Sequence, residues 1–454
     1  MGSTAIGRLI YRSVVALRGE GAVFRRIEEF QRLAALPVDR VAEAQAAKLA
    51  AVLNQACAHA PYYRRLTGSP QRVKAGEAWA RLADLPLTGK AELQEHWEAM
   101  RATNFHGRVT VKVTGGSTGQ AVTIVKNREA LASEMAASWM GYGWFGIVMG
   151  DRAVRLWGSP FTFRRRLRYR AADFAMNRLT FSAFAFSDAD LARYWRRCLS
   201  FRPAYLYGYV SMVEAFARYI EREGLDATAL GLKAVVTTSE VLSDVQRKLI
   251  STAFRCPVQN EYGCGEVGPV AYECEQGSLH IMTPNLALEI LKDDGTRAGP
   301  GESGEIVLTD LNNIAMPLIR YRVGDFGVPG TPCSCGRGFA TLERIWGRQY
   351  DFVETPDGRR HHGEYFMYLF EDIRRGGVTI DQFQVTQDGA RSLSILLVSH
   401  ANLSPEVQAA VQEQVEHRVP GMTVSVTVVP EIARLTSGKM HVIRNTWRGG
   451  GASA

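Results

Sequence analysis

The chain has 454 residues, of which 46% are hydrophobic and 22% charged, with a mean hydropathy of −0.12. This composition is typical of a folded soluble protein, not of a disordered or membrane-embedded one, and the length suits one large and one smaller domain. The net charge of +8 raises nucleic acid as a partner, but the one dense basic run, residues 164–170, has no nucleic-acid-binding motif beside it. We therefore expect no nucleic-acid partner and interpret the run as a solvated face or, alternatively, as a site for a polyanionic cosubstrate.

The location of the protein is predicted from what the sequence lacks. No apolar run reaches the roughly 18 residues that a membrane-spanning helix needs, and residues 1–19 contain neither a long apolar stretch nor a small-residue cleavage site. We therefore expect a cytoplasmic protein without a membrane partner. Its seven cysteines are an odd number, and without a secretory signal they favour free thiols or metal ligands over disulfides.

Helical spacing dominates the beginning of the chain. Between about Val23 and Leu66, apolar residues recur at multiples of four, with a break at Pro37. We therefore predict a helical N-terminal segment over about residues 1–100. From Arg108 to Val125 the pattern changes to period two on both sides of a glycine-rich stretch, which predicts strand, loop and strand.

Beyond this hairpin, helical stretches alternate with short apolar strands up to about residue 330, which predicts a layered α/β domain. The predicted elements are helices at 190–199 and 211–223 and strands at 233–238 and 305–309. The last hundred residues form a separate α+β pattern, with strands at 382–386, 392–398 and 423–429 and a helix at 404–417. We therefore predict an α/β fold with a large N-terminal domain, residues 1–347, and a small C-terminal α+β domain, residues 348–454.

The glycine-rich stretch 114–120 combines three glycines with Ser117 and Thr118 between the two predicted strands. Glycines allow the backbone to turn tightly, and hydroxyls beside exposed N–H groups form a concave row of donors that suits a polyphosphate. The stretch is not a Walker loop, because the Gly-Lys-Ser/Thr ending and the following helix are missing. Taken alone, it is equally compatible with a plain hairpin turn.

Four later motifs follow in order: NEYGCGE at 260–266, IRYRVGD at 319–325, GR at 347–348 and SGK at 437–439. With the glycine-rich loop, they resemble the adenylate-forming superfamily and, more narrowly, phenylacetate-coenzyme A ligases and capsular-polysaccharide CapK proteins. The likeness runs from AHAPYYR at 58–64 to Lys439. It implies an ATP-dependent ligase with a mobile small domain. This ligase would form an acyl-adenylate and pass the acyl group to a thiol, with coenzyme A as the leading candidate.

The resemblance also implies roles for individual residues. Ser117, Thr118 and Gly119 would cover the triphosphate, and Tyr262 would lie against the adenine. Asp325 would accept hydrogen bonds from both ribose hydroxyls, and Glu266 would bind Mg²⁺ through its carboxylate. Lys439, catalytic together with Glu266, would reach the substrate carboxylate and the α-phosphate. Further nucleotide-site positions are Glu240, Glu261, Gly263 and Arg348.

Two positions depart from the family pattern. Gly265 stands where most relatives have threonine or serine, so one hydroxyl contact to the phosphate is absent. Tyr350 stands at the usual hinge aspartate and Asp351 follows it, which leaves the pivot within residues 348–351. Singly, Tyr262 is also compatible with a core aromatic and Asp325 with a turn residue.

Three thiols and an imidazole occur in two short clusters, Cys274 with His280 and Cys333 with Cys335. A structural zinc site takes four such ligands. The spacing is not that of a zinc finger, and the alternative is a buried Cys274 beside a Cys-Ser-Cys-Gly turn. Because some relatives resemble this arrangement and bind zinc there, we predict a structural zinc ion held by these four side chains.

Aromatic side chains are frequent in the large domain, where the acid would bind. Candidates for lining its pocket are Trp139, Tyr142, Trp144, Trp157, Tyr207 and Tyr209. Their abundance favours an aromatic acid, although the same side chains suit a core. An amine or a carrier protein is an alternative acceptor, and a non-catalytic nucleotide-binding homologue is the alternative from another class. Lys439 and Glu266 argue against the latter, since a pure binder needs neither.

Overall fold

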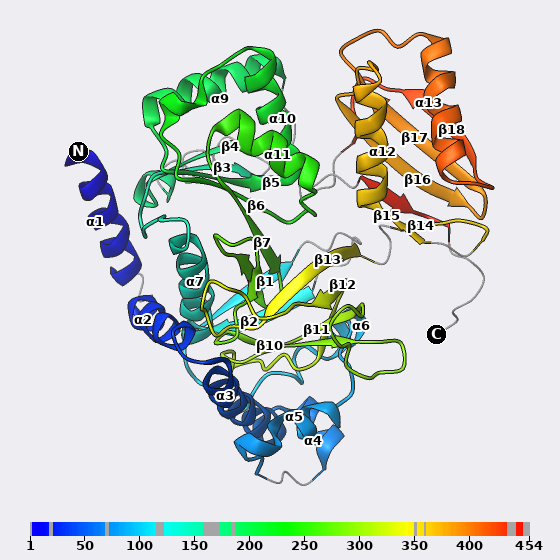
Figure 1. Ribbon diagram of the computed structural model, residues 1–454. Helices are drawn as coiled ribbons and strands as arrows, with labels where there is room; N and C mark the ends of the chain where they lie inside the picture. Colours follow the sequence, from blue (N-terminus) through cyan, green and yellow to red (C-terminus); the bar gives the residue numbers. More distant parts are fainter. Residues whose placement is uncertain are drawn as a thin grey trace.

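The computed structural model describes residues 2–17, 21–68, 72–114, 122–157, 172–182, 187–348, 352–357, 360–433 and 442–447. Two bodies are visible in Figure 1, a large one built on an 11-stranded sheet and a small one built on a four-stranded sheet. Within the described residues, no helix is both long and apolar enough to cross a membrane.

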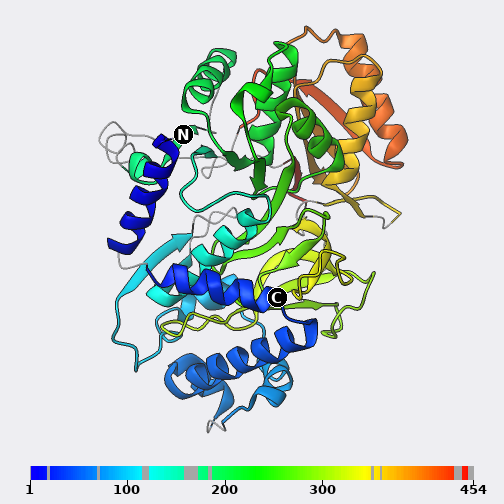
Figure 2. The ribbon, with the colours of Figure 1, turned by 60° about the vertical axis from the view of Figure 1, so that its left-hand side comes forward.

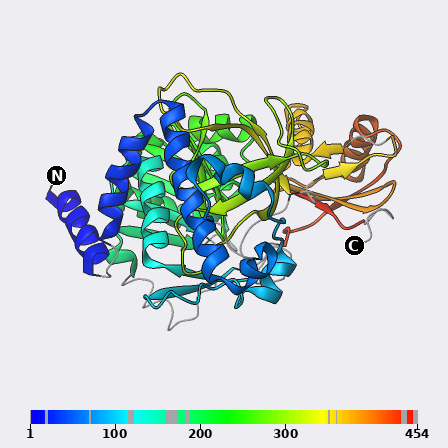
Figure 3. The ribbon, with the colours of Figure 1, turned by 90° about the horizontal axis from the view of Figure 1, so that it is seen from below.

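Helices make up the beginning of the chain, as predicted. They are α1 (Gly2–Leu17), α2 (Ala22–Ala34), α3 (Val38–His59), α4 (Pro61–Thr67), η1 (Ala75–Glu77), α5 (Ala78–Ala83) and α6 (Lys90–His96). The predicted break at Pro37 is confirmed, because this proline is the N-cap of α3. Helix α3 buries Leu49, Leu53 and Cys57 at the predicted spacing. Figures 2 and 3 show α1 on the side of the molecule opposite the small domain.

The large sheet has the strand order β10-β11-β12-β13-β9-β8-β7-β6-β5-β3-β4. Strands β4, β3, β5, β6 and β7 are parallel to one another. The remaining strands, β8, β9, β13, β12, β11 and β10 in the order of the sheet, each pair antiparallel with their neighbours. Its strands are β3 (Ala153–Trp157), β4 (Arg178–Ser182), β5 (Tyr205–Tyr209), β6 (Ala234–Thr238), β7 (Val258–Cys264), β8 (Gly268–Glu273), β9 (Leu279–Ile281), β10 (Leu286–Leu291), β11 (Gly304–Asp310), β12 (Tyr321–Pro329) and β13 (Thr341–Arg348).

Helices cover both faces of the parallel half, which explains why its strands are apolar on both sides. One face carries α9 (Asp188–Phe201), α10 (Val210–Arg222), η2 (Ala227–Leu230) and α11 (Asp244–Phe254), and the other carries α7 (Arg128–Gly143) packed against α2. Successive side chains along β5 point to opposite faces of the sheet. Leu206 therefore packs in the core under α9, α10 and α11, and Tyr205 packs in the core under α7 and α2. The predicted hairpin is confirmed as β1 (Val109–Thr114) paired antiparallel with β2 (Val122–Asn127).

The small domain has the predicted α+β content. Its sheet has the order β18-β17-β16-β19, and Phe366 and Phe370 of α12 pack with Phe383 and Val385 of β16 in its core. The elements are β14 (Phe352–Glu354), β15 (Arg360–His362), α12 (Gly363–Arg375), β16 (Gln382–Gly389), β17 (Ser392–Val398), α13 (Pro405–Arg418), β18 (Thr423–Val428) and β19 (Ile443–Asn445).

Candidate functional site

A cavity of about 1090 Å³ lies between the two domains. The large domain contributes residues at the carboxyl ends of β6 and β7 and from β12, including Tyr262 and Asp325. The small domain contributes Arg374, Asp381 and His400. Ligands of open α/β sheets bind outside the carboxyl ends of the parallel strands, so this cavity is where the fold places a substrate.

Tyr262 and Asp325 meet at the wall of this cavity. The Tyr262 hydroxyl donates a hydrogen bond of 2.8 Å to Oδ2 of Asp325, although the two residues are 63 positions apart. Asp325 lies directly opposite Arg348 in the pairing of β12 with β13. The structure therefore brings an aromatic ring and a carboxylate together at the wall of the cavity, and the backbone of the GR motif pairs with the strand that carries the carboxylate.

Glu240 and Glu261 also border the cavity, but their carboxylates lie in different surroundings. Glu240 accepts hydrogen bonds from the backbone N–H of Ser211 at 2.6 Å and from its hydroxyl at 3.0 Å, at the beginning of α10. Glu261 lies in β7, the strand next to β6, and accepts hydrogen bonds from the hydroxyls of Tyr142 at 2.9 Å and Tyr207 at 3.2 Å. Glu240 therefore also orients the first turn of a helix.

Glu261 is buried on the face of β7 opposite Tyr262, because successive side chains of a strand alternate. Burial raises the pKa of its carboxyl above the ordinary value, although hydrogen bonds from Tyr142 and Tyr207 act in the opposite direction. The protonated, neutral form of the Glu261 carboxyl is therefore more favoured than it would be for a glutamate at the protein surface.

Glu266 lies in the turn between β7 and β8, and Gly263 of the same motif lies within β7. The thiol of Cys264 donates a hydrogen bond of 3.2 Å to Oε2 of Glu266. Burial raises the pKa of Cys264 well above its ordinary value, so the thiol keeps its proton and remains a donor. This contact holds the carboxylate at the tip of the turn.

Several predicted residues lie outside the described part of the chain. These are Ser117, Thr118 and Gly119 of the glycine-rich loop, the basic run 164–170, Tyr350, Asp351 and Lys439. The residues that flank the glycine-rich loop are described, and Thr114 pairs with Val122 at the loop end of the β1-β2 hairpin.

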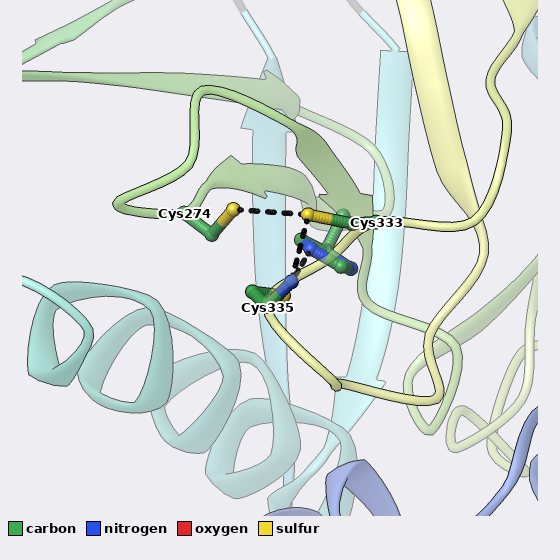
Figure 4. Close-up of side chains that lie close together, drawn as sticks. Cys274, Cys333 and Cys335 are labelled. Atoms are coloured by element: carbon green, nitrogen blue, oxygen red, sulfur yellow. Dashed lines mark hydrogen bonds between the residues drawn. The ribbon is translucent and has the colours of Figure 1, made fainter.

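The four predicted metal ligands converge, as Figure 4 shows for the three cysteines. The ligand atoms of Cys274, His280, Cys333 and Cys335 all lie within 4.8 Å of one another. Sγ of Cys274 is 3.7 Å from Sγ of Cys333, and Sγ of Cys335 is 3.2 Å from Nε2 of His280. The other ring nitrogen, Nδ1, is 3.2 Å from the carbonyl oxygen of Phe339.

The predicted pocket aromatics separate into two groups. Trp157 stacks on Tyr207 with ring centroids 5.6 Å apart and lies 4.5 Å from Tyr209, while Tyr142 is 6.2 Å from Tyr207. Trp139 instead packs edge-on against Tyr11 of α1, and Trp144 lies against His280. The guanidinium of Arg155, a residue that we did not predict, lies 4.0 Å from the Trp157 ring. The sequence could have indicated this contact, because side chains two residues apart on a strand lie on the same face.

Comparison with known proteins places this geometry in a family. The sequence profile described as AMP-binding enzyme matches residues 36–315. The chain belongs to the AMP-binding enzyme family. Among its members, the chain is 25% identical to the CapK protein of Staphylococcus aureus over 61% of each chain. It is also 25% identical to the phenylacetate-coenzyme A ligase of Escherichia coli, over 85% of this chain and 89% of the ligase.

Solved structures of AMP-binding enzymes share the fold. A 2-hydroxyisobutyryl-CoA ligase in its postadenylation state, in complex with R3-HIB-AMP, has a TM-score of 0.72 at 19% identity, over 91% of both chains. The same ligase in its thioesterification state, with 2-HIB-AMP and CoA, has a TM-score of 0.56 at 18% identity, again over 91% of both chains. The predicted fold class and the predicted resemblance are thereby confirmed.

Proposed function

We propose that the chain is an ATP-dependent ligase that converts a carboxylic acid to its acyl-adenylate, releases pyrophosphate and transfers the acyl group to coenzyme A. The observation that carries the proposal is the Tyr262-Asp325 pair at the wall of the cavity between the domains. Membership of the AMP-binding enzyme family supports it. The coenzyme A ligases among the similar proteins support the choice of acceptor.

ATP fits this wall by its chemistry. The Tyr262 ring offers a flat face to the adenine, and the Asp325 carboxylate offers two acceptor oxygens to the ribose hydroxyls. Glu266 supplies a hard oxygen ligand of the kind that Mg²⁺ prefers, and Mg²⁺ there would neutralise phosphate charge. The substrate carboxylate then attacks the α-phosphorus in line, a reaction in which the protein contributes mainly positioning and charge.

We further propose that residues 1–347 and 348–454 rotate relative to each other between the two half-reactions. Strand β13 of the large sheet ends at Arg348, so the proposed boundary falls at the last residue of this strand. The higher TM-score to the postadenylation state than to the thioesterification state supports an arrangement near the former. Lys439 would reach the reacting carboxylate in the adenylating arrangement and leave it in the other.

We propose that the cysteine-histidine cluster is a structural zinc site. Three thiols and one imidazole are the donor set that tetrahedral zinc takes. The contact of Nδ1 of His280 with the Phe339 carbonyl directs Nε2 toward the thiols. When bound, zinc would join the turn between β8 and β9 to the segment that leads into β13.

The acid that we propose is an aromatic one. Trp157, Tyr207 and Tyr209 form a stacked group at the carboxyl ends of β3 and β5, and Arg155 extends it with a cation over a ring. Such a group provides a flat surface for a flat acyl group. Strand β6 separates β5 from β7, and across it Tyr207 of this group donates a hydrogen bond to Glu261 of β7 at 3.2 Å.

ATP-pyrophosphate exchange with a panel of aryl, amino and short-chain acids tests the proposal. We expect exchange that depends on an aryl acid. Consumption of free thiol then separates coenzyme A from an amine or a carrier protein as the acceptor. Binding of ATP without exchange for any acid would instead favour a non-catalytic nucleotide-binding protein.

A further inference from the structure

A buried lysine forms the centre of an ionic cluster next to the nucleotide motifs. The Lys126 side chain is fully buried at the end of β2. Its ammonium donates to the carboxylate of Glu134 on α7, to Oδ2 of Asp310 at 3.0 Å, and to the carbonyl oxygen of Val267 at 2.9 Å. Lys112 of β1 also donates to Glu134, at 2.6 Å.

Lys126 and two of its partners, Val267 and Asp310, belong to segments that lead to proposed ATP ligands. Lys126 itself lies on the strand that leaves the glycine-rich loop. Val267 directly follows Glu266, the proposed magnesium ligand. Asp310 ends β11, and the chain runs from there to Asp325 in β12.

Short hydrogen bonds fix these segments further. Oδ1 of Asp310 accepts from the backbone N–H groups of Asn312 and Asn313, and the Asn313 amide donates to the Val125 carbonyl at 3.0 Å. The contact at Gly268 is also tight, because a Cβ atom there would lie 2.6 Å from Cγ of Glu134. The glycine therefore permits the turn after Glu266 to approach α7.

The electrostatics favour one geometry. Burial alone would lower the pKa of Lys126, but Asp310 and Glu134 raise it above the ordinary value. The ammonium therefore stays charged, and a buried charge requires its partners to remain in place. A displaced partner would leave a charge without compensation in a water-free environment.

We propose that Lys126 is a positioning residue for ATP, which fixes strand β2, the Glu266 turn and the segment after Asp310 relative to one another. The inference rests on the proposed function, since it takes these segments as the ATP ligands. Because the Lys126 side chain is fully buried, its effect on the phosphates would pass through the Glu266 turn. A purely structural ion pair would lower stability without changing the dependence of the reaction on Mg-ATP.

The test compares Lys126→Met and Lys126→Arg with Lys233→Met. Lys233 is the control, because its ammonium also donates to a carboxylate, Asp151 at 2.8 Å, and to a carbonyl, Gly146 at 2.6 Å, but it lies directly before β6 and is partly exposed. We expect Lys126→Met to raise KM for Mg-ATP in pyrophosphate exchange by about tenfold to a hundredfold, with KM for the acid unchanged. Lys126→Arg should restore part of the loss, and Lys233→Met should keep the parental KM for Mg-ATP.

If Lys126→Met does not fold, Lys126→Met combined with Asp310→Asn removes the opposing charge, and Glu134→Gln perturbs the cluster from another element. An unchanged KM for Mg-ATP in a folded Lys126 variant overturns the inference, as does an equal rise in KM for the acid. Absence of exchange in the parent chain would count against the proposed function, and calorimetric Kd values for Mg-ATP would then decide the role of Lys126. A parent that binds no Mg-ATP overturns both.

Discussion

Replacement of Asp325 by alanine is a direct test of the nucleotide assignment. A hydrogen bond to a charged group contributes about 1.5 to 3 kcal/mol, and every 1.4 kcal/mol corresponds to about a tenfold change in affinity. The Tyr262 hydroxyl already orients the carboxylate at 2.8 Å, so little reorganisation offsets this contribution. We therefore expect Asp325→Ala to raise KM for ATP at least tenfold, with a smaller change in kcat.

The assay is pyrophosphate exchange with ATP and with 2′-deoxy-ATP. The parent chain should discriminate against the deoxynucleotide by about tenfold or more, because Asp325 would lose one of its two partners. In Asp325→Ala this discrimination should disappear. Tyr262→Phe is the matched control, since it keeps the ring and the carboxylate and removes only the hydroxyl between them. It should raise KM for ATP less than Asp325→Ala and retain the discrimination.

The refuting result is specific. If Asp325→Ala still prefers ATP over 2′-deoxy-ATP as strongly as the parent chain, the carboxylate does not bind the ribose. Asp325 would then serve only to hold Tyr262 and the end of β12.

Three further predictions concern other parts of the molecule. Cys335→Ser should lower the zinc content from about one equivalent per chain and lower Tm, because metal binding contributes to folding; Cys256→Ser is the control, and absence of zinc in protein purified without chelator would contradict the site. Burial raises the pKa of the Glu261 carboxyl in the folded protein above its value in the unfolded chain. The protonated carboxyl therefore contributes stability at a pH below the unfolded-state pKa, and this contribution is lost as pH rises through the folded-state pKa. In urea titrations, the unfolding free energy of Glu261→Gln minus that of the parent should therefore be larger at pH 8 than at pH 5. The same difference at both pH values would exclude this effect. Lys439→Ala should slow acyl-adenylate formation by about a hundredfold while transfer from supplied acyl-adenylate survives; equal loss of both half-reactions in rapid-quench assays would refute its role.

Local patterns in the sequence predicted the helical beginning of the chain, the β1-β2 hairpin and the α+β content of its end. The spacing of Leu49, Leu53 and Cys57 predicted α3, and the period-two pattern around the glycine-rich loop predicted the β1-β2 hairpin. In both cases the burial of one face determines the pattern, so neighbouring residues carry the information. The strand β19 was not predicted, because three residues that pair parallel with β16 leave too short a pattern.

The site was predicted less completely, because it depends on contacts between distant segments. The residue types of the cysteine-histidine cluster indicated a metal, but its convergence depends on the pairing of β9 with β13. The sequence offered no means to distinguish Trp139, which packs against Tyr11 of α1, from Trp157, which stacks on Tyr207 of β5. Lys126 occupies an apolar position of the alternation in β2, a signal that we did not use, and its partners come from other elements.

The cluster around Lys126 limits how the protein can be recombined with its relatives. A chimera that takes its glycine-rich hairpin from another family member, without a lysine at this position, would leave Glu134 and Asp310 as two buried carboxylates without their common cation. Such a graft should fail even when the loop sequence itself is suitable, because like charges in a low dielectric repel strongly. The transferable unit is therefore the hairpin with the adjoining α7 residue Glu134, together with Asp310, which lies 184 positions from Lys126 in the sequence and next to it in the folded chain.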